Sequence, residues 1–158
     1  MVLPQGPPPP HHVLFLCTEN ACRSQMAEAW LRHLAGDAIR ASSAGTRPAT
    51  LHPMSVRAMA EVGVDLGGQR AKGLSDVDLA SVTQVVTVCD GAAAECPALL
   101  QDLPHRHWPV PDPASIAREF PHLVSDGFRA VRDNLKDRVT LLVRELTAVS
   151  DGQMRKIV

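Results

Sequence analysis

Residues 13–24 read VLFLCTENACRS, and this stretch decides the fold. Its first four residues form a short continuous apolar run, which is typical of a strand buried on both faces of a parallel sheet. The next segment, residues 25–36, places apolar side chains on one helical face and ends at a glycine, a common helix stop. These apolar side chains are Met26, Ala27, Trp30, Leu31 and Leu34. The predicted order is strand, loop and helix, with the loop at the carboxyl end of the strand.

The same alternation of strand and helix patterns continues along the chain. Further strands are expected over residues 39–43 and 85–88, and an edge strand over residues 106–110. Helical patterns cover residues 53–63, 74–82, weakly 91–100, and a long amphipathic stretch at 128–146. This order predicts an α/β fold: a single domain whose central four-stranded parallel sheet is flanked by helices on both faces, with right-handed crossovers.

Length, composition and charge limit the possible functions. With 158 residues, 45% of them apolar, the chain is long enough for one core and unlike a disordered protein. Its 16 basic and 17 acidic residues give a net charge of −1, which offers no global attraction to nucleic acid or to an anionic membrane. No signal peptide and no apolar span of about 18 residues is recognisable. We therefore expect a cytoplasmic protein, and we expect it to be a monomer.

The domain boundaries follow from the same patterns. Residues 1–12 are rich in proline and lack apolar periodicity, which indicates a disordered leader. The folded domain is expected over residues 13–150, and residues 151–158 are expected to form a flexible tail. We interpret His11 and His12, at the end of the leader, as a solvated pair rather than a metal-binding tract.

The loop after the first strand has a pattern suited to an oxyanion. A tight loop entering a helix points backbone N–H groups inward, and the helix dipole adds positive potential. Cys17 would lie at the base of this nest, with its pKa lowered by the dipoles and by Arg23. The Arg23 guanidinium would hold two oxygens of a tetrahedral anion. The substrate-binding residues expected from the loop are Thr18, Glu19, Asn20, Ala21, Cys22, Arg23 and Ser24.

Three of these loop residues carry further expectations. Ser24 would donate a hydrogen bond to the sulfur, and Asn20 would adopt a left-handed backbone conformation that turns the loop. Glu19 would face solvent, because its carboxylate would repel an anion in the nest. The alternative is a buried cysteine and an arginine at this spacing by chance, but the strand before the loop and the helix after it favour a site.

Two more cysteines and an aspartate follow later strands. Cys89 and Asp112 come just past predicted strands, so they should meet Cys17 at one edge of the sheet. Cys89 and Cys96 lie seven residues apart and could be buried thiols, zinc ligands or a redox relay. Given a nucleophile at Cys17, the relay is the most economical account. Asp112 lies between two prolines, which suits either an ordinary turn or a rigidly held general acid.

Three motifs in combination carry a resemblance to a known family. They are VLFLCTENACRSQMAEAW from residue 13, SSAG at residues 42–45 and VVTVCDGAAAECP at residues 85–97. From residue 13 to its last helix, the chain resembles the thioredoxin-coupled arsenate reductases. These enzymes share the fold of the low-molecular-weight tyrosine phosphatases.

The resemblance implies a role for each of three cysteines. Cys17 would attack the arsenic of arsenate while Asp112 protonates the departing oxygen. Cys89 would then attack Cys17, and arsenite would leave. Cys96 would next attack Cys89 and move the disulfide to the surface, where thioredoxin reduces it. Cys22 is not required, and no bound organic cofactor is implied.

Some members of this family bind potassium beside the loop, and this chain departs from their pattern at one position. Asn20, Glu28 and Ser43 match three of the four ligand positions, but the fourth is Lys72. An ammonium group there would pair with Glu28 in place of the cation, so we predict no bound metal and little or no stimulation by potassium. A solvated surface lysine is the alternative. The remaining histidines show no spacing typical of metal ligands.

Three classes of function remain open from the residues. The first is arsenate reduction with thioredoxin, which we expect, with residual phosphatase activity. The second is a low-molecular-weight protein tyrosine phosphatase that uses Cys17, Arg23 and Asp112 alone, although the extra cysteines Cys89 and Cys96 count against it. The third is a thiol protein that binds a metal or senses it without turnover.

Overall fold

The computed structural model describes residues 10–89, 91–92 and 96–157, with side chains described as far as residue 147. Within these residues the strands form one sheet in the order β2-β1-β3-β4, and every neighbouring pair is parallel. The strands are β1 His12–Cys17, β2 Arg40–Gly45, β3 Gln84–Thr87 and β4 His105–His107. The predicted α/β fold with a four-stranded parallel sheet is confirmed.

The helices agree with most of the sequence patterns, and residues 93–95 of the weak helical pattern at 91–100 lie outside the described residues. The α-helices of the described residues are α1 Arg23–Ala35, α2 Pro53–Ala60, α4 Pro113–Glu119 and α5 Val124–Ile157. The 3₁₀ helices are η1 Gly36–Ala38, η2 Leu74–Asp76, η3 Leu79–Ser81, η4 Ala98–Leu100 and η5 Pro121–Leu123. The helical turn expected over residues 74–82 is thus the pair η2 and η3. The sequence patterns did not predict α4, because a Pro-Asp-Pro run is also a common turn signal.

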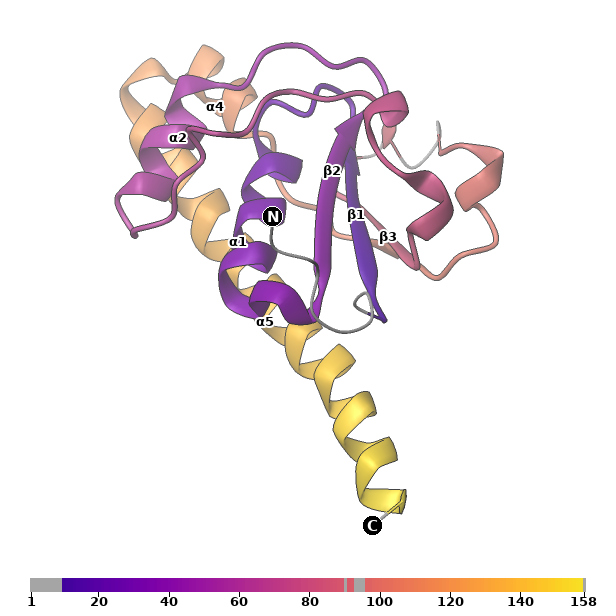
Figure 1. Ribbon diagram of the computed structural model, residues 1–158. Helices are drawn as coiled ribbons and strands as arrows, with labels where there is room; N and C mark the ends of the chain where they lie inside the picture. The colour runs from indigo at the N-terminus through magenta and orange to yellow at the C-terminus, as the bar shows by residue number, and fades with distance from the viewer. Residues whose placement is uncertain (1–9, 90, 93–95, 158) are drawn as a thin grey trace, which may run out of the picture.

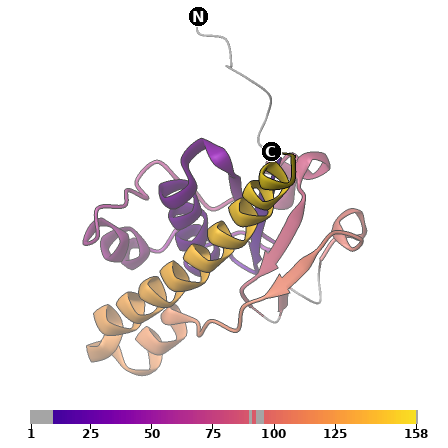
Figure 2. The ribbon, with the colours of Figure 1, turned by 90° about the horizontal axis from the view of Figure 1, so that it is seen from below.

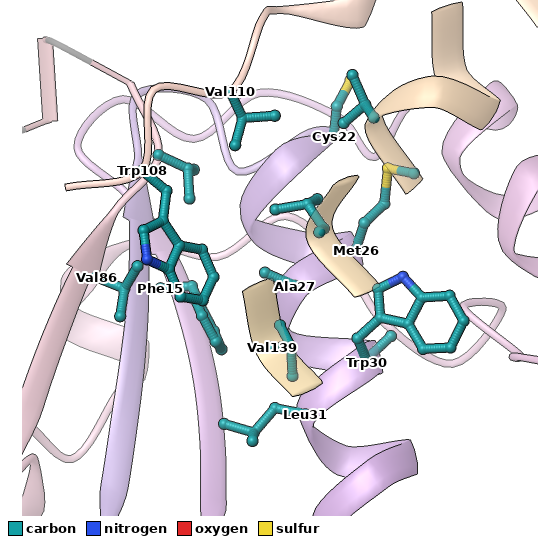
Figure 3. Close-up of a cluster of buried hydrophobic side chains, with 14 of the residues drawn as sticks. Phe15, Cys22, Met26, Ala27, Trp30, Leu31, Val86, Trp108, Val110 and Val139 are labelled. Carbon is teal, nitrogen blue, oxygen red and sulfur yellow. The ribbon is translucent and has the colours of Figure 1, made fainter. Parts of the chain in front are cut away.

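The two faces of the sheet are packed differently because side chains alternate along β1. Val13 and Phe15 belong to the larger hydrophobic cluster, which lies between the sheet, α1 and α5 (Figures 1 and 3). Leu14 and Leu16 belong to a smaller cluster closed by residues of η3 and η4 and their flanks. Full burial of a side chain such as Phe15 contributes about 1.5–3 kcal/mol to stability. Helices therefore cover both faces, with long α-helices on one and short 3₁₀ turns on the other.

Two predicted elements end at residues other than those expected. β4 ends at His107, so the edge strand does not continue to residue 110. α5 continues to Ile157 and extends past the sheet (Figures 1 and 2), so its backbone is helical through most of the expected tail. The flexibility of residues 151–158 stays a prediction.

His12 was expected to be solvated, but it belongs to β1 and is buried. It is only 2% exposed, because η3 packs beside this end of the sheet. Its Nδ1 lies 2.8 Å from Ser81 Oγ, and its Nε2 lies 2.8 Å from Ser42 Oγ. The expectation for His12 is therefore wrong, and the rest of the leader up to residue 9 lies outside the described residues. None of the described helices is both long enough and apolar enough to cross a bilayer.

Candidate active site

Cys17 lies at the carboxyl end of β1, in the loop that leads into α1. Its side chain is buried, with 4% exposure. The sulfur is 2.8 Å from Ser24 Oγ, and the backbone N–H of Asn20 donates to it at 3.1 Å. Asn20 has a φ of 53°, and Glu19 is exposed. The predicted positions of Ser24, Asn20 and Glu19 are therefore confirmed.

The end of β2 holds this loop in place by a close backbone approach. A Cβ atom at Gly45 would lie 2.6 Å from the Thr18 carbonyl oxygen and 2.9 Å from the Asn20 nitrogen, so only glycine fits. The next residue, Thr46, donates its backbone N–H to the Cys17 carbonyl at 3.1 Å. The glycine of the SSAG motif thus positions the cysteine loop by packing.

A buried network of amides supports the loop from behind. Gln25 has 0% exposure, and its Nε2 donates to Asn20 Oδ1 at 2.8 Å and to the Arg70 carbonyl at 2.6 Å. The backbone N–H of Lys72 donates to the same Oδ1 at 2.8 Å. Asn20 Nδ2 in turn donates to Ser24 Oγ at 2.7 Å, which links the network to the Cys17 sulfur. Sequence reasoning missed Gln25, whose only signal is a polar residue beside the apolar stripe of the helix.

The environment of Cys17 corrects one electrostatic expectation. Burial raises the pKa of Cys17, and this effect outweighs the hydrogen bonds from Ser24 and the Asn20 amide, which lower it. The expected net lowering of the Cys17 pKa by the loop and Arg23 is therefore wrong.

We predict that alkylation of Cys17 by iodoacetamide accelerates with pH up to and beyond pH 9, the ordinary thiol pKa. The thiolate is the reacting form, and a raised pKa moves its formation to higher pH. Ser24→Ala removes a hydrogen bond that lowers this pKa, so the rate at pH 8 should fall about threefold to tenfold. Peptide mass spectrometry gives the rate for each cysteine.

Cys22 serves as an internal reference in the same experiment. Burial raises its pKa to about 12, so its alkylation should stay slow below that pH and rise only as the pH approaches it. A Cys17 profile that is already flat below pH 7 would contradict the raised pKa.

Arg23, Cys89 and Asp112 converge with Cys17 in a surface pocket of about 230 Å³. The residues that line it are Cys17, Thr18, Glu19, Ala21, Cys22, Arg23, Cys89, Gly91, Asp112 and Arg118. Asn20 and Ser24 lie behind the loop and contact Cys17 instead of lining the pocket. Arg118 was not singled out by the sequence, because no local pattern connects it to the loop.

Arg23 is the first residue of α1, and two carbonyl groups hold its guanidinium. Its Nη1 donates to the Val88 carbonyl at 3.1 Å and to the Val110 carbonyl at 2.9 Å. These carbonyls follow β3 and β4, so Arg23 ties the ends of both strands to the start of α1. The other N–H groups of its planar fork are the ones that suit an oxyanion in the pocket.

Cys89 and Cys96 occupy different places relative to the pocket. Cys89 follows β3, and its sulfur lies 3.3 Å from Thr18 Oγ1 in the cysteine loop. Cys96 is half-buried, lies outside the pocket lining, and packs with Cys89 against the smaller cluster. Burial raises the pKa of Cys96. Residues 90 and 93–95, between the two cysteines, lie outside the described residues.

Asp112 combines the two interpretations that the sequence left open. Its backbone is extended, and its Oδ1 accepts the N–H of Ala114 at 3.0 Å, so it caps α4, which begins with Pro113. The same carboxyl group lines the pocket with Cys17. The residue is therefore both a structural cap and a group within reach of the site.

The predicted pairing of Lys72 with Glu28 is confirmed. Glu28 is 3% exposed, and its Oε1 lies 3.3 Å from Lys72 Nζ and accepts the Ser43 hydroxyl at 2.7 Å. Lys72 Nζ also lies 3.4 Å from Ser43 Oγ. The ammonium group thus sits among the oxygen atoms that would surround a potassium ion, so these residues do not fit one. Among the described residues, no group of three or more His, Cys, Asp or Glu side chains is arranged to hold a metal.

A family model described as low molecular weight phosphotyrosine protein phosphatase matches residues 12–151. The chain belongs to the low molecular weight phosphotyrosine protein phosphatase family.

Several relatives within the low molecular weight phosphatase family are arsenate reductases. The arsenate reductase of Bacillus subtilis (strain 168) is 38% identical over 127 residues, which cover 80% of this chain and 91% of the relative. That of Staphylococcus aureus (strain Newman) is 32% identical over 126 residues, covering 80% of this chain and 96% of the relative. These similarities confirm the resemblance to arsenate reductases drawn from the motifs.

Solved structures of this family agree with the fold. An arsenate reductase in the phosphate binding state superposes with a TM-score of 0.73 at 29% identity, covering 85% of this chain and 98% of that one. A thioredoxin-dependent arsenate reductase of Corynebacterium glutamicum has a TM-score of 0.72 at 27% identity, covering 89% and 64%. The Escherichia coli K30 tyrosine phosphatase in complex with sulphate has a TM-score of 0.71 at 18% identity, with coverage of 85% and 97%, and shares the fold alone.

Proposed function

We propose that this protein reduces arsenate to arsenite through a relay of thiols, and that thioredoxin reduces the final disulfide. One observation carries the proposal: Cys17 and Cys89 share a pocket with Arg23 and Asp112, while Cys96 lies outside it. A phosphatase of this fold has no need of two further cysteines. The names of the arsenate reductase relatives support the same reaction.

The first step forms a bond between sulfur and arsenic(V). Arsenate would lie against the N–H groups of the loop and the Arg23 guanidinium. Because the pKa of Cys17 is raised, its thiol proton has to leave as the nucleophile forms, and the arsenate dianion can accept it. The Cys17 sulfur then attacks arsenic, one As–O bond breaks, and Asp112 gives the departing oxygen a proton so that water leaves. Arsenic keeps its oxidation state in this step.

The second and third steps move two electrons and then the disulfide. Cys89 attacks the Cys17 sulfur, the S–As bond breaks, and its electron pair stays on arsenic, which leaves as arsenite. The two thiols have then been oxidised to a Cys17–Cys89 disulfide. Cys96 attacks the Cys89 sulfur and releases Cys17 as a thiolate, which leaves a Cys89–Cys96 disulfide for thioredoxin. The hydrogen bond between Thr18 and Cys89 supports the proximity that the second step needs.

Consumption of NADPH by thioredoxin reductase tests the proposal directly. With the protein and thioredoxin present, NADPH should be consumed only when arsenate is added, and Cys89→Ser should abolish this consumption. Hydrolysis of p-nitrophenyl phosphate without arsenate-dependent consumption would instead assign the protein to the phosphatases. Tight arsenite binding without turnover would assign it to the thiol sensors. Because the relay starts from reduced thiols, we expect the protein to work in the cytoplasm. We also expect it to be a monomer.

We predict that potassium leaves the reductase activity unchanged within about twofold at constant ionic strength, because Lys72 supplies the positive charge beside Glu28. The measurement compares potassium with a tetraalkylammonium salt as the counterion. Lys72→Asp, which restores the pattern of the potassium-binding relatives, should make activity depend on potassium. Stimulation of the unmodified protein by severalfold would contradict the prediction.

Substitutions of Asp112 should separate its two roles. Asp112→Asn keeps a good N-cap but cannot give a proton, so unfolding in urea should be almost unchanged while the first step slows about 10²–10⁴-fold. Asp112→Ala should lose the cap as well and reduce the unfolding free energy by about 1 kcal/mol. Single-turnover release of arsenite measures the rate. An Asn variant with the full rate would show that Asp112 is only a cap.

A further inference from the structure

The pocket contains a second arginine that the proposed mechanism does not use. Arg118 lies on α4, lines the pocket with Cys17 and Arg23, and is exposed to solvent. In the part of the chain that the structure describes, its guanidinium takes part in no ion pair or hydrogen bond. Its five N–H donors are therefore available to a ligand that enters the pocket.

The two arginines of the pocket differ in their surroundings. Arg23 is partly buried, and two carbonyls engage its Nη1. Arg118 stands at the rim, where the exposed Glu19 carboxylate is its counterpart of opposite sign. The net charge of the chain is only −1, so no global field guides an anion to the site. Attraction of a dianion must come from local charges, and Arg118 is the exposed cation of the lining.

The fold places Arg118 in a fixed relation to Asp112. Asp112 caps α4, and Arg118 follows six residues later, about 9 Å farther along the helix axis. α4 packs against α5, where a Cβ atom at Gly127 would lie 3.3 Å from Ile116 Cγ2. This tight contact holds the short helix, so the cation and the carboxyl group are carried by one rigid unit.

We propose that Arg118 is a further binding residue of this site, which recruits an oxyanion dianion to the pocket. Its guanidinium attracts the dianion at the rim of the pocket, and the dianion then binds to the loop and Arg23. The Glu19 carboxylate repels the dianion and so weakens this attraction. The effect is on encounter and binding, because a rim charge changes association rates and their salt dependence more than it changes a chemical step. The assignment of arsenate as that dianion rests on the proposed function.

Steady-state kinetics with arsenate form the first test. Arg118→Gln should raise KM about fivefold to tenfold, leave kcat within about twofold, and flatten the dependence of kcat/KM on salt. Arg118→Lys should restore most of the loss, and Glu19→Gln should lower KM. Arg57→Gln, an exposed arginine of α2 outside this pocket, is the matched control and should change nothing. An unchanged KM and salt dependence in Arg118→Gln would overturn the proposal.

Alkylation of Cys17 provides a test that does not depend on arsenate reduction. Iodoacetate is an anion and iodoacetamide is neutral, so the ratio of their rates at Cys17 reports the local attraction of anions. Arg118→Gln should lower this ratio about threefold to tenfold, and added salt should lower it more where Arg118 is present. Circular dichroism of each variant confirms folding. If arsenate is not reduced but the ratio falls, the proposed reaction fails and the role of Arg118 stands. If arsenate is reduced but the ratio is unchanged, the role of Arg118 fails alone.

Discussion

Replacement of Cys96 with serine is expected to stop arsenate reduction after a single turnover. Cys96→Ser leaves the pocket intact, so each protein molecule should release one arsenite and then stop as a Cys17–Cys89 disulfide. Steady-state NADPH consumption with thioredoxin should fall to background, because no thiol remains to move the disulfide outward. Arsenite counting in a rapid-quench experiment gives the single turnover, and peptide mass spectrometry identifies the trapped disulfide.

The same variant distinguishes the competing functions. A phosphatase would be unaffected by Cys96→Ser, since Cys96 lies outside the pocket lining. A thiol sensor would lose arsenite affinity and show no turnover in either form. Full steady-state reduction by Cys96→Ser would show that Cys96 is not the shuttle.

Cys17→Ser is expected to abolish arsenate reduction altogether, with a loss of about 10⁴-fold or more, as is typical when a nucleophile is removed. A hydroxyl group ionises far less readily than a thiol, and serine cannot form the disulfide on which the second step depends. Neither a single turnover nor alkylation at position 17 should remain.

Cys22→Ser is the matched control for Cys17→Ser. Cys22 is also buried, belongs to the same loop, and packs into the larger cluster at the start of α1 (Figure 3). We expect this variant to retain the unmodified rate within about twofold, because the relay does not use Cys22. Calorimetry with inorganic phosphate should show that Cys17→Ser still binds an oxyanion through the loop and Arg23. Loss of phosphate binding would mean that the substitution disturbs the loop itself.

Local patterns predicted the features of this site that are formed locally. The apolar run before the loop and the stripe after it define β1 and α1, and the left-handed Asn20 and the Ser24 contact follow from a short loop between them. The Lys72–Glu28 pair spans a long sequence distance and became predictable only through the resemblance, which supplied four positions to compare. Without that comparison, a surface lysine was equally reasonable.

Most of the misjudged features depend on packing between distant segments. The pKa of Cys17 was expected to be lowered because the sequence shows the loop and the helix whose dipoles stabilise a thiolate. The burial that outweighs these dipoles comes from neighbouring elements. His12 resembles the leader in composition, and only its contact with η3 makes it a buried strand residue. α4 was missed because the helix cap at Asp112 and an ordinary turn share the same residues. Gln25 and Arg118 carry no pattern of their own, and three-dimensional proximity alone connects them to the loop.

The tethered ammonium of Lys72 has a consequence for how this protein can change over evolutionary time. A protein that binds a dissolved ion beside its buried carboxylate can lose and regain that ion. Here the positive charge beside Glu28 belongs to a side chain, so only a mutation can remove it. Among the described residues, a neutral residue at position 72 would leave Glu28, 3% exposed, with the half-exposed Arg32 as its cationic partner. A change from lysine to an acidic residue by way of a neutral one therefore passes through an unfavourable stage, in which the buried carboxylate lacks its ammonium partner. Lineages with this lysine should keep it, or replace it by arginine, far more often than they replace it by a neutral residue.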